Sequence, residues 1–430
     1  MTVRAAITGL GAVTGFGRGS DRLWSALLEG QRAMRVQPRL LAAGLAVGPV
    51  ALVDALALEA PARAAQLARW AAAEALADAG GPPHGSRLAV ACGTTLGGIA
   101  EWLPWVRAHA LAEPGATAEP APDTAAAPAE ALSAMVEPIA SMVKPLATPA
   151  GWSYVGPAQA VANEIGARGP LTVPSVACAS SNVALGAALE LVRSGRCDVV
   201  VAGGVDVLHD FVLAGFACLK AVDSEPCRPF DRQRRGLNLG EAACFLIVES
   251  EAHARARGAR IRAFLDGCGV AADAVHMTGP DREGRGAARA MQAALLDAGR
   301  PARAIDYVSA HGTATLFNDL MESKALALTL GERAATTPVN SIKSALGHTL
   351  GAAAALEALA CVRTLETGLV PPTPGLEELD PEIHLDVVRD APRALAARAV
   401  LSTASGFGGT NAAVVLSAAT AAPPSASPGR

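Results

Sequence analysis

The stretch that decides the fold is TVPSVACASSNVALGAALELVR, which runs from Thr172 to Arg193. A strand-like run precedes Cys178, and hydrophobic residues set among alanines follow it, which is typical of a strand, a turn and a largely buried helix. Ser180, Ser181 and Asn182 are N-cap candidates, so the thiol is expected near the positive end of a helix dipole. That position favours the thiolate and predicts a nucleophile, whereas a buried structural cysteine is the alternative.

Two histidines far downstream are candidate partners for this cysteine. His311 lies in SAHGTATLFND and His348 in SIKSALGHTLG, and each stands beside a glycine that lets backbone or substrate come close. Lys343, a lysine in a chain whose basic residues are mostly arginine, precedes His348 by five residues. In a condensation reaction, one cysteine can act as the nucleophile while two histidines act as hydrogen-bond donors. A lone histidine, however, is more often structural.

Several further motifs carry a resemblance to a known family. They are ITGLGAVTGFG (7–17), VACASS around Cys178, VVVAGGVDV (199–207), RPFDRQRRGLNLGEAA (228–243), HGTATLFND, NSIKSALGHTLGAA and SGFGGTNAAVVL (405–416). Together they resemble the elongating β-ketoacyl-acyl-carrier-protein synthases of the thiolase superfamily, in order and over nearly the whole chain. The resemblance implies an α/β, thiolase-like five-layer αβαβα fold built from two similar halves.

The expected domain organisation follows from this resemblance. Residues 1–255 form the half with the nucleophilic cysteine, 256–417 the half with both histidines, and 418–430 a disordered tail. Strand-like and helical patterns alternate along both halves, which favours layered α/β structure with parallel strands, although residue identity reveals no repeat. The Pro- and Ala-rich composition at about 102–150 is typical of a surface excursion. This excursion either shapes the acyl pocket or is a tolerated surface insertion.

The resemblance also implies a division of catalytic work. Cys178 would accept an acyl chain as a thioester, and the backbone N–H groups of Cys178 and Phe407 would bind the oxyanion. Neutral imidazoles at His311 and His348 would stabilise the enolate that forms when a malonyl unit loses carbon dioxide. The expected reaction is therefore decarboxylative Claisen condensation, an acyltransferase activity.

Three charged residues match supporting positions of the family. Lys343 and Glu322 are expected to form a buried ion pair, and Asp319 fits the same network more weakly. From the residues alone, a solvated helix position is the simpler interpretation of Glu322.

The glycine-rich segment near the C-terminus is expected to gate the cysteine. Gly406, Phe407 and Gly408 match the family's gate. Ser405 departs from the family, in which this position is often aromatic, and predicts a looser gate or a wider, less hydrophobic acyl pocket. With the long excursion, Ser405 favours an unusual acyl chain of polyketide or polyene type.

No cofactor and no metal are expected, and the substrates would be carried on the phosphopantetheine of a separate acyl carrier protein. The eight cysteines lack the CxxC pairs of a zinc site. A homodimer, or a heterodimer with a homologous synthase or chain-length subunit, follows from the resemblance. The net charge of −4 with interspersed signs argues against nucleic acid or membrane-surface partners. No signal peptide and no run of ~20 apolar residues is evident, so a reducing cytoplasm is expected.

Two other functions remain open at this point. One is a non-catalytic partner that sets chain length, although such subunits typically lose the cysteine. The other is a coenzyme A thiolase, which the second histidine disfavours. Nucleotide binding is disfavoured. GLGAVTGFG superficially resembles a phosphate-binding loop, but its glycines lack the GxGxxG spacing.

Overall fold

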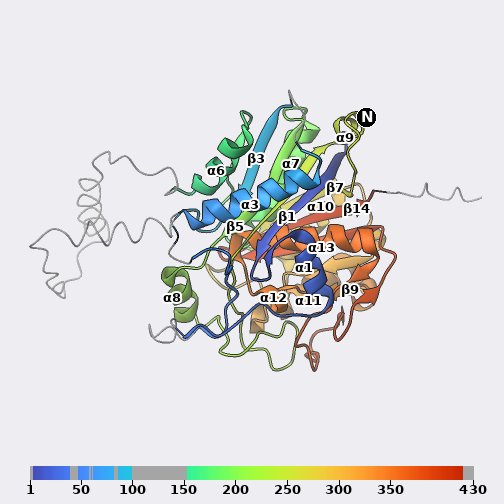
Figure 1. Cartoon of the computed structure of the whole chain (residues 1–430). Coiled ribbons are helices and arrows are strands. Elements are labelled where there is room, and N and C mark those ends of the chain that lie inside the picture. Colours follow the sequence, from blue (N-terminus) through green and yellow to red (C-terminus); the bar gives the residue numbers. More distant parts are fainter. Residues whose placement is uncertain are drawn as a thin grey trace, which may run out of the picture.

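One long sheet organises the chain (Figure 1). The computed structural model describes residues 3–38, 47–57, 60, 62–81, 86–98 and 153–419. Within them, twelve strands follow the order β11-β9-β8-β13-β14-β7-β1-β6-β5-β3-β4, with β2 paired to β1. The 102–150 excursion and residues 420–430 of the expected tail lie outside the described residues, so both remain predictions.

The strands of this sheet are β1 (Ala5–Thr14), β2 (Gly17–Arg18), β3 (Leu88–Gly93), β4 (Leu171–Thr172), β5 (Val199–Asp206), β6 (Ala242–Ser250), β7 (Ala263–Ala272), β8 (Tyr307–Ser309), β9 (Pro338–Asn340), β11 (Asp386–Val387), β13 (Ala399–Gly406) and β14 (Thr410–Ala418). A separate pair consists of β10 (Leu369–Val370) and β12 (Arg393–Ala394).

The helices are α1 (Ser20–Leu28), α3 (Arg63–Asp78), α6 (Gly156–Ile165), α7 (Ser180–Arg193), α8 (Asp210–Cys218), α9 (Glu251–Ala256), α10 (Arg285–Asp297), α11 (Leu316–Leu330), α12 (Lys343–Leu346) and α13 (Ala353–Thr367). Short 3₁₀ turns are η1 (Ala302–Ala304), η2 (Gly331–Ala335) and η3 (Leu350–Ala352).

The two halves of the sheet repeat one order of elements. Apart from inserted elements, β1-α3-β3-α6-β4-α7-β5-β6 is matched by β7-α10-β8-α11-β9-α13-β13-β14. In each half three neighbouring strands are parallel and two more continue the sheet antiparallel, and in the second half the short edge strand β11 adds a fourth parallel strand beside β9. The halves join where β1 pairs antiparallel with β7. The repeat that residue identity hides is therefore present in the topology.

Helices and sheet form five layers (Figure 1). Helices α3 and α6 cover the outer face of the first half, and α10 and α11 cover that of the second. Helices α7 and α13 lie between the two halves of the sheet. Three hydrophobic cores fill the spaces between these layers, and the middle one includes Ala355, Leu356 and Ala358–Val362 of α13. This arrangement confirms the thiolase-like fold.

Glycines in matching strands let helices lie close to the sheet. A Cβ on Gly9 or Gly11 of β1 would stand about 2 Å from a carbonyl oxygen of α3, at 2.1 and 2.0 Å. A Cβ on Gly267 or Gly269 of β7 would meet α10 in the same way, at 2.5 and 2.1 Å. Gly9 and Gly11 of GLGAVTGFG therefore serve helix packing within a strand that continues to Thr14, and do not form a phosphate loop.

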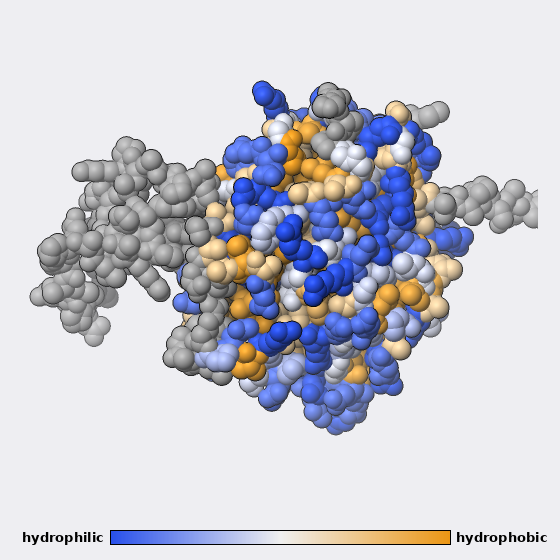
Figure 2. All heavy atoms as spheres, in the orientation of Figure 1, coloured by the Kyte–Doolittle hydropathy of each residue, from blue (hydrophilic) through white to orange (hydrophobic). Residues whose placement is uncertain are grey.

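The long periodic segments are where the sequence places them. The strand-like runs of the sequence at 3–10, 88–92, 198–205 and 243–249 form β1, β3, β5 and β6, and its helical patterns at 62–79 and 350–365 form α3 and α13. The helical pattern at 252–260 is longer than the helix it forms, because α9 ends at Ala256. Figure 2 shows hydrophilic and hydrophobic residues interspersed over the face of Figure 1. Within the described ranges, no helix has the length and hydrophobicity to cross a membrane.

Candidate active site

A tight turn between β4 and α7 holds Cys178. Ala177 takes a left-handed conformation at φ 51°, which turns the chain sharply before the cysteine. The Val176 N–H donates to Ser180 Oγ at 2.9 Å, and Ser180 Oγ donates to the Ala177 carbonyl at 2.5 Å. The N-cap is Ala179, so the prediction that a serine or asparagine caps α7 is wrong, and Ser180 instead fastens the turn.

Burial dominates the electrostatics of the thiol. Cys178 is 6% exposed, and burial raises the pKa of its thiol to about 12, with Lys343 the largest opposing influence. The expectation that the helix dipole favours a thiolate at rest is therefore wrong. The nucleophile is protonated until a substrate arrives, and its proton has to leave as the thioester forms.

This burial predicts the pH dependence of chemical modification. Because the thiolate fraction rises tenfold per pH unit below the pKa, alkylation of Cys178 by iodoacetamide is expected to rise about tenfold per unit from pH 7 to 9 without a plateau. Peptide mass spectrometry measures the rate, and the exposed Cys218 reports whether the reagent remains active. A plateau below pH 9 would contradict the assigned burial effect.

His311 and His348 meet beside the cysteine in one cavity. His311 follows β8, and His348 lies between α12 and η3. Their ring centroids are 5.4 Å apart and nearly perpendicular, at 86°. Burial, with the charge of Lys343, lowers the pKa of both rings well below the usual value, so both are neutral at pH 7.

Hydrogen bonds assign the protons on both rings. The Leu350 N–H donates to His348 Nδ1 at 3.2 Å, so the proton of His348 is on Nε2. Lys343 Nζ lies 3.2 Å from His311 Nδ1, and as an ammonium it donates there, which also leaves the His311 proton on Nε2. Each ring therefore keeps one N–H donor for a ligand, as enolate stabilisation requires.

The ion-pair partner of Lys343 is Glu357 in α13, not Glu322. Lys343 Nζ donates to a carboxylate oxygen of Glu357 and to the His311 carbonyl at 2.7 Å. Burial raises the pKa of Glu357 to about 7, against the opposing charge of Lys343. Glu357 has no motif that marks it in the sequence, but it is the lone acidic residue in the apolar run AAALEALACV, which is a signal for a buried and paired charge.

Glu322 instead anchors the backbone around His311. Its carboxylate accepts the N–H of His311 at 2.7 Å, the N–H of Gly312 at 2.8 Å and the hydroxyl of Thr403 at 2.6 Å. The side chain is buried, so the solvated interpretation is excluded, and burial raises the pKa of Glu322. Its role is to hold the loop that carries the first histidine.

Asp319 belongs to a separate cluster. It accepts the Phe230 N–H at 2.8 Å and pairs with Arg234 at 3.8 Å, and burial raises its pKa to about 6. The Phe230 ring closes against Gly312, where a Cβ would lie 3.0 Å from it. Asp319 thus supports the His311 loop through Phe230, and the expectation that it joins the Lys343 network is wrong.

The gate segment lies against the nucleophile turn. A Cβ on Gly406 would stand 2.9 Å from the Val176 carbonyl and 3.2 Å from the Cys178 nitrogen, so only glycine fits there. The Phe407 ring is 37% exposed and stacks on Phe216 of α8, with centroids 5.6 Å apart. The Gly408 N–H donates to the Met277 carbonyl at 2.7 Å. The oxyanion role of the Cys178 and Phe407 N–H groups remains a prediction.

Ser405 lines the cavity and is tied to the gate by hydrogen bonds. Its hydroxyl donates to Asn411 Oδ1 at 2.7 Å, and Asn411 Nδ2 donates to Asp273 Oδ1 at 2.7 Å. The Asp273 N–H in turn donates to the Gly409 carbonyl at 2.7 Å. This chain of bonds ties Ser405 to the gate segment, and both the looser gate and the wider, less hydrophobic pocket remain predictions.

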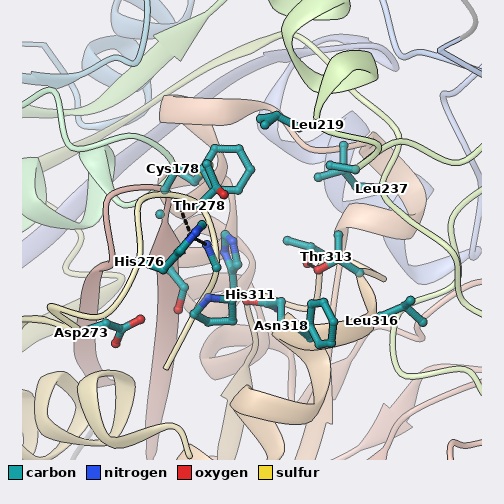
Figure 3. Close-up of a pocket in the computed structure, with 18 of the residues that line it drawn as sticks. Cys178, Leu219, Leu237, Asp273, His276, Thr278, His311, Thr313, Leu316 and Asn318 are labelled. Atoms are coloured by element: carbon teal, nitrogen blue, oxygen red, sulfur yellow. Dashed lines mark hydrogen bonds between the residues drawn. The ribbon is translucent and has the colours of Figure 1, made fainter. Parts of the chain in front are cut away.

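The cavity that joins these groups has a volume of about 740 Å³ (Figure 3). Cys178 and His311 face it, with Thr313, Leu316 and Asn318 on one side and Leu219 and Leu237 on another. Its lining also includes His348 and the three basic side chains Lys220, Arg235 and Arg282. All three basic residues are exposed, and the Arg282 guanidinium lies 4.3 Å above the Phe317 ring. The cavity therefore combines a thiol and two imidazoles with three exposed basic side chains. Arg235 is paired with Asp223 at 3.0 Å, and the acidic residues Asp273 and Asp281 also line the cavity.

Known proteins resemble this chain over its full length. The Beta-ketoacyl synthase N-terminal domain model matches residues 3–254, and the Beta-ketoacyl synthase C-terminal domain model matches 262–377. Nodulation protein E of Rhizobium meliloti (strain 1021) is 34% identical over 424 residues, 96% of this chain and 98% of that protein. Putative polyketide beta-ketoacyl synthase 1 of Streptomyces cyaneus is 35% identical over 446 residues, 97% of this chain and 98% of that protein.

Two solved structures are similar over the whole fold. The complex AntDE:AntF, a type II PKS acyl-carrier protein with its ketosynthase bound to the hexaketide, matches with a TM-score of 0.85 at 30% identity, covering 97% of this chain and 100% of that chain. The ishigamide ketosynthase/chain length factor matches with a TM-score of 0.80 at 30% identity, covering 98% and 100%.

Proposed function

Because this chain belongs to the beta-ketoacyl synthase family of condensing enzymes, we propose that it extends a polyketide-type acyl chain by decarboxylative Claisen condensation. The acyl group would be held on Cys178, and the extender would be malonyl-acyl carrier protein. The observation that carries the proposal is that the cysteine and two neutral histidines line the same cavity.

The first step transfers the acyl chain to the enzyme. The Cys178 sulfur attacks the thioester carbonyl of the acyl carrier, an S–C bond forms, and the bond to the carrier sulfur breaks. The proton of the Cys178 thiol passes to the departing carrier thiolate, so no charge remains. The Cys178 and Phe407 N–H groups bind the oxyanion, a contribution of about 3 kcal/mol for one such donor.

The second step forms the carbon–carbon bond. The malonyl thioester loses carbon dioxide, and the electron pair of the broken bond delocalises onto the thioester oxygen as an enolate. His311 and His348 each donate their Nε2–H to this oxygen. The enolate carbon then attacks the Cys178 thioester, which releases 3-oxoacyl carrier, and the Cys178 thiolate takes up a proton from solvent.

These steps use only side chains and backbone N–H groups of this chain, so we propose that the protein needs no metal or organic cofactor of its own. The thioesters arrive on the phosphopantetheine arm of a separate carrier protein, which is acidic in this family. Lys220, Arg235 and Arg282 at the cavity mouth suit an anionic partner. By analogy with the ketosynthase/chain length factor pair, we propose that this chain works as a dimer, with itself or with a homologous subunit.

A charge-reversal experiment checks the docking site. The double variant Lys220→Glu and Arg282→Glu is expected to raise the KM for malonyl-carrier by about tenfold or more, because two attractive charges become repulsive. Activity with a small malonyl-pantetheine thioester should change by less than about threefold, because it lacks the carrier surface. Arg232→Glu, at an exposed position outside the cavity lining, is the matched control. Equal losses with both substrates would place the effect inside the site and contradict docking.

A reconstituted reaction tests the proposed function itself. Malonyl-carrier labelled at C2 should deliver its label to a 3-oxoacyl product while the free carboxyl is released as carbon dioxide. The polyketide assignment predicts preference for unsaturated or 3-oxo primers over saturated chains of equal length. Comparable turnover on saturated chains of every length would remove that assignment but leave the condensation. The non-catalytic subunit alternative predicts neither label transfer nor carbon dioxide release.

A further inference from the structure

A buried aspartate lies behind the second histidine. Asp206 ends β5, is 0% exposed, and does not line the cavity. Its carboxylate accepts four hydrogen bonds, from Thr94 Oγ1 at 2.8 Å, Thr95 N at 2.8 Å, Leu96 N at 3.0 Å and Gly351 N at 2.6 Å. Burial raises its pKa to about 6 while these donors act in the opposite direction, so Asp206 is ionised at pH 7.

The fourth of these bonds reaches the segment that carries His348. Gly351 belongs to η3, which begins at Leu350, and Leu350 takes a left-handed conformation at φ 55°. A Cβ on Gly351 would lie 2.6 Å from Asp206 Oδ2, so the carboxylate and this backbone fit closely. The Leu350 N–H, one residue before the bond to Asp206, is the donor to His348 Nδ1. A carboxylate of the first half thus holds the peptide that orients a histidine of the second half.

We propose that Asp206 is a positioning residue for His348, an inference that rests on the proposed function. The carboxylate fixes the Leu350–Gly351 backbone in its left-handed turn, and that backbone directs the Leu350 N–H at His348 Nδ1. The bond keeps the ring proton on Nε2, where the enolate oxygen needs it. Without the anchor the ring can exchange tautomers, and decarboxylation loses one of its two donors.

The same carboxylate also acts on the thiol. Lys343 lowers the pKa of Cys178, whereas Asp206 and Glu357 raise it. Replacing Asp206 by a neutral amide therefore moves the pH dependence of Cys178 alkylation to lower pH. This shift comes from the charge of Asp206, so alkylation shows independently of turnover whether the carboxylate is ionised, as an anchor of four donors requires.

The test is Asp206→Asn, which keeps the shape and removes the charge. Malonyl decarboxylation is expected to fall about 10- to 100-fold, less than the roughly 10²- to 10³-fold loss typical when one oxyanion donor is removed outright, because the donor is misdirected and not deleted. Acyl transfer to Cys178 should stay within about threefold. ¹⁵N spectra of histidine-labelled protein should show His348 changing from the Nε2–H form to a tautomer mixture. Alkylation of Cys178 should proceed faster than in the wild type at each pH from 7 to 9.

A matched control separates positioning from general damage. Asp231→Asn also removes a buried carboxylate that accepts three backbone N–H groups, but these come from Gln233, Glu377 and Glu378 and not from the segment that carries His348. This variant should leave the ratio of decarboxylation to transfer unchanged. Equal loss of both steps in Asp206→Asn, or an unshifted alkylation profile, would overturn the inference.

A milder variant covers the case in which Asp206→Asn fails to fold. Thr94→Val removes one hydrogen bond to Asp206 and keeps the shape of the side chain. It should lower the rate of decarboxylation about threefold or more and leave the rate of acyl transfer unchanged. An equal loss of both rates would overturn the inference. If wild-type protein neither takes an acyl group nor releases carbon dioxide, the proposed function fails instead, so the two failures are distinguishable.

Discussion

Replacing Cys178 by alanine is expected to abolish acyl transfer and condensation, with a loss of more than about 10³-fold, because no other cysteine is among the described residues that line the cavity. Malonyl decarboxylation should persist, since its donors are His311 and His348 rather than sulfur. Rates of carbon dioxide release and of product formation, measured on the same sample, separate the two activities.

The matched control is Cys268→Ala. Burial raises the pKa of the Cys268 thiol to about 12 as well, but this residue lies outside the cavity lining. Its loss should leave both activities within about twofold, as for changes that touch no functional group. Condensation that survives in Cys178→Ala would exclude this residue as the nucleophile.

Replacing Lys343 by methionine is expected to cost both stability and activity. Removing one partner of a buried ion pair leaves Glu357 unpaired, which typically lowers the free energy of unfolding by about 3–5 kcal/mol. His311 also loses the donor that fixes its tautomer, so decarboxylation should fall at least about 10²-fold. Denaturant unfolding and carbon dioxide release measure the two effects.

The stability loss should depend on pH. Burial already raises the pKa of Glu357, and loss of the Lys343 charge raises it further. A carboxyl group whose pKa is higher folded than unfolded stabilises the fold at low pH, and this stability is lost as pH rises through the folded pKa. The gap in Tm between variant and wild type should therefore widen from pH 5.5 to pH 8.

Two further variants define what the lysine does. Adding Glu357→Gln to Lys343→Met should restore much of the stability, because no buried charge is left, but not the decarboxylation rate. Lys324→Met, which breaks an exposed pair with Glu283, should change the free energy of unfolding by less than about 1 kcal/mol. A Lys343→Met protein of normal stability at pH 8 would contradict the buried pair.

The fold was predictable from sequence where residue patterns are local. The strand before GLGAV and the alanine-rich helix at 62–79 carry their own periodicity, and both are present as β1 and α3. The two-fold repeat was not visible in residue identity, because packing constrains residue size rather than type. Its trace in sequence is the glycine spacing of Gly9 and Gly11 in β1 and of Gly267 and Gly269 in β7.

The site was predictable in its reacting groups but not in their partners. Cys178, His311 and His348 stand in motifs with recognisable neighbours, whereas the partner of Lys343 depends on how α13 packs. Asp206 shows the same limit, since its donors Thr94 and Gly351 are 112 and 145 residues away along the chain. A position at a helix N-terminus suggested that the pKa of the Cys178 thiol is lowered. Burial, which depends on the folded structure, raises this pKa instead.

Intact-mass analysis of the wild-type protein tests the central claim most directly. The protein is incubated with a panel of acyl-carrier thioesters, and malonyl-carrier is then added. We expect one acyl adduct, mapped to Cys178, that disappears on addition of malonyl-carrier as a 3-oxoacyl carrier two carbons longer accumulates. No adduct with any donor from a folded protein, also when a homologous subunit is supplied, would contradict the account and favour a non-catalytic partner.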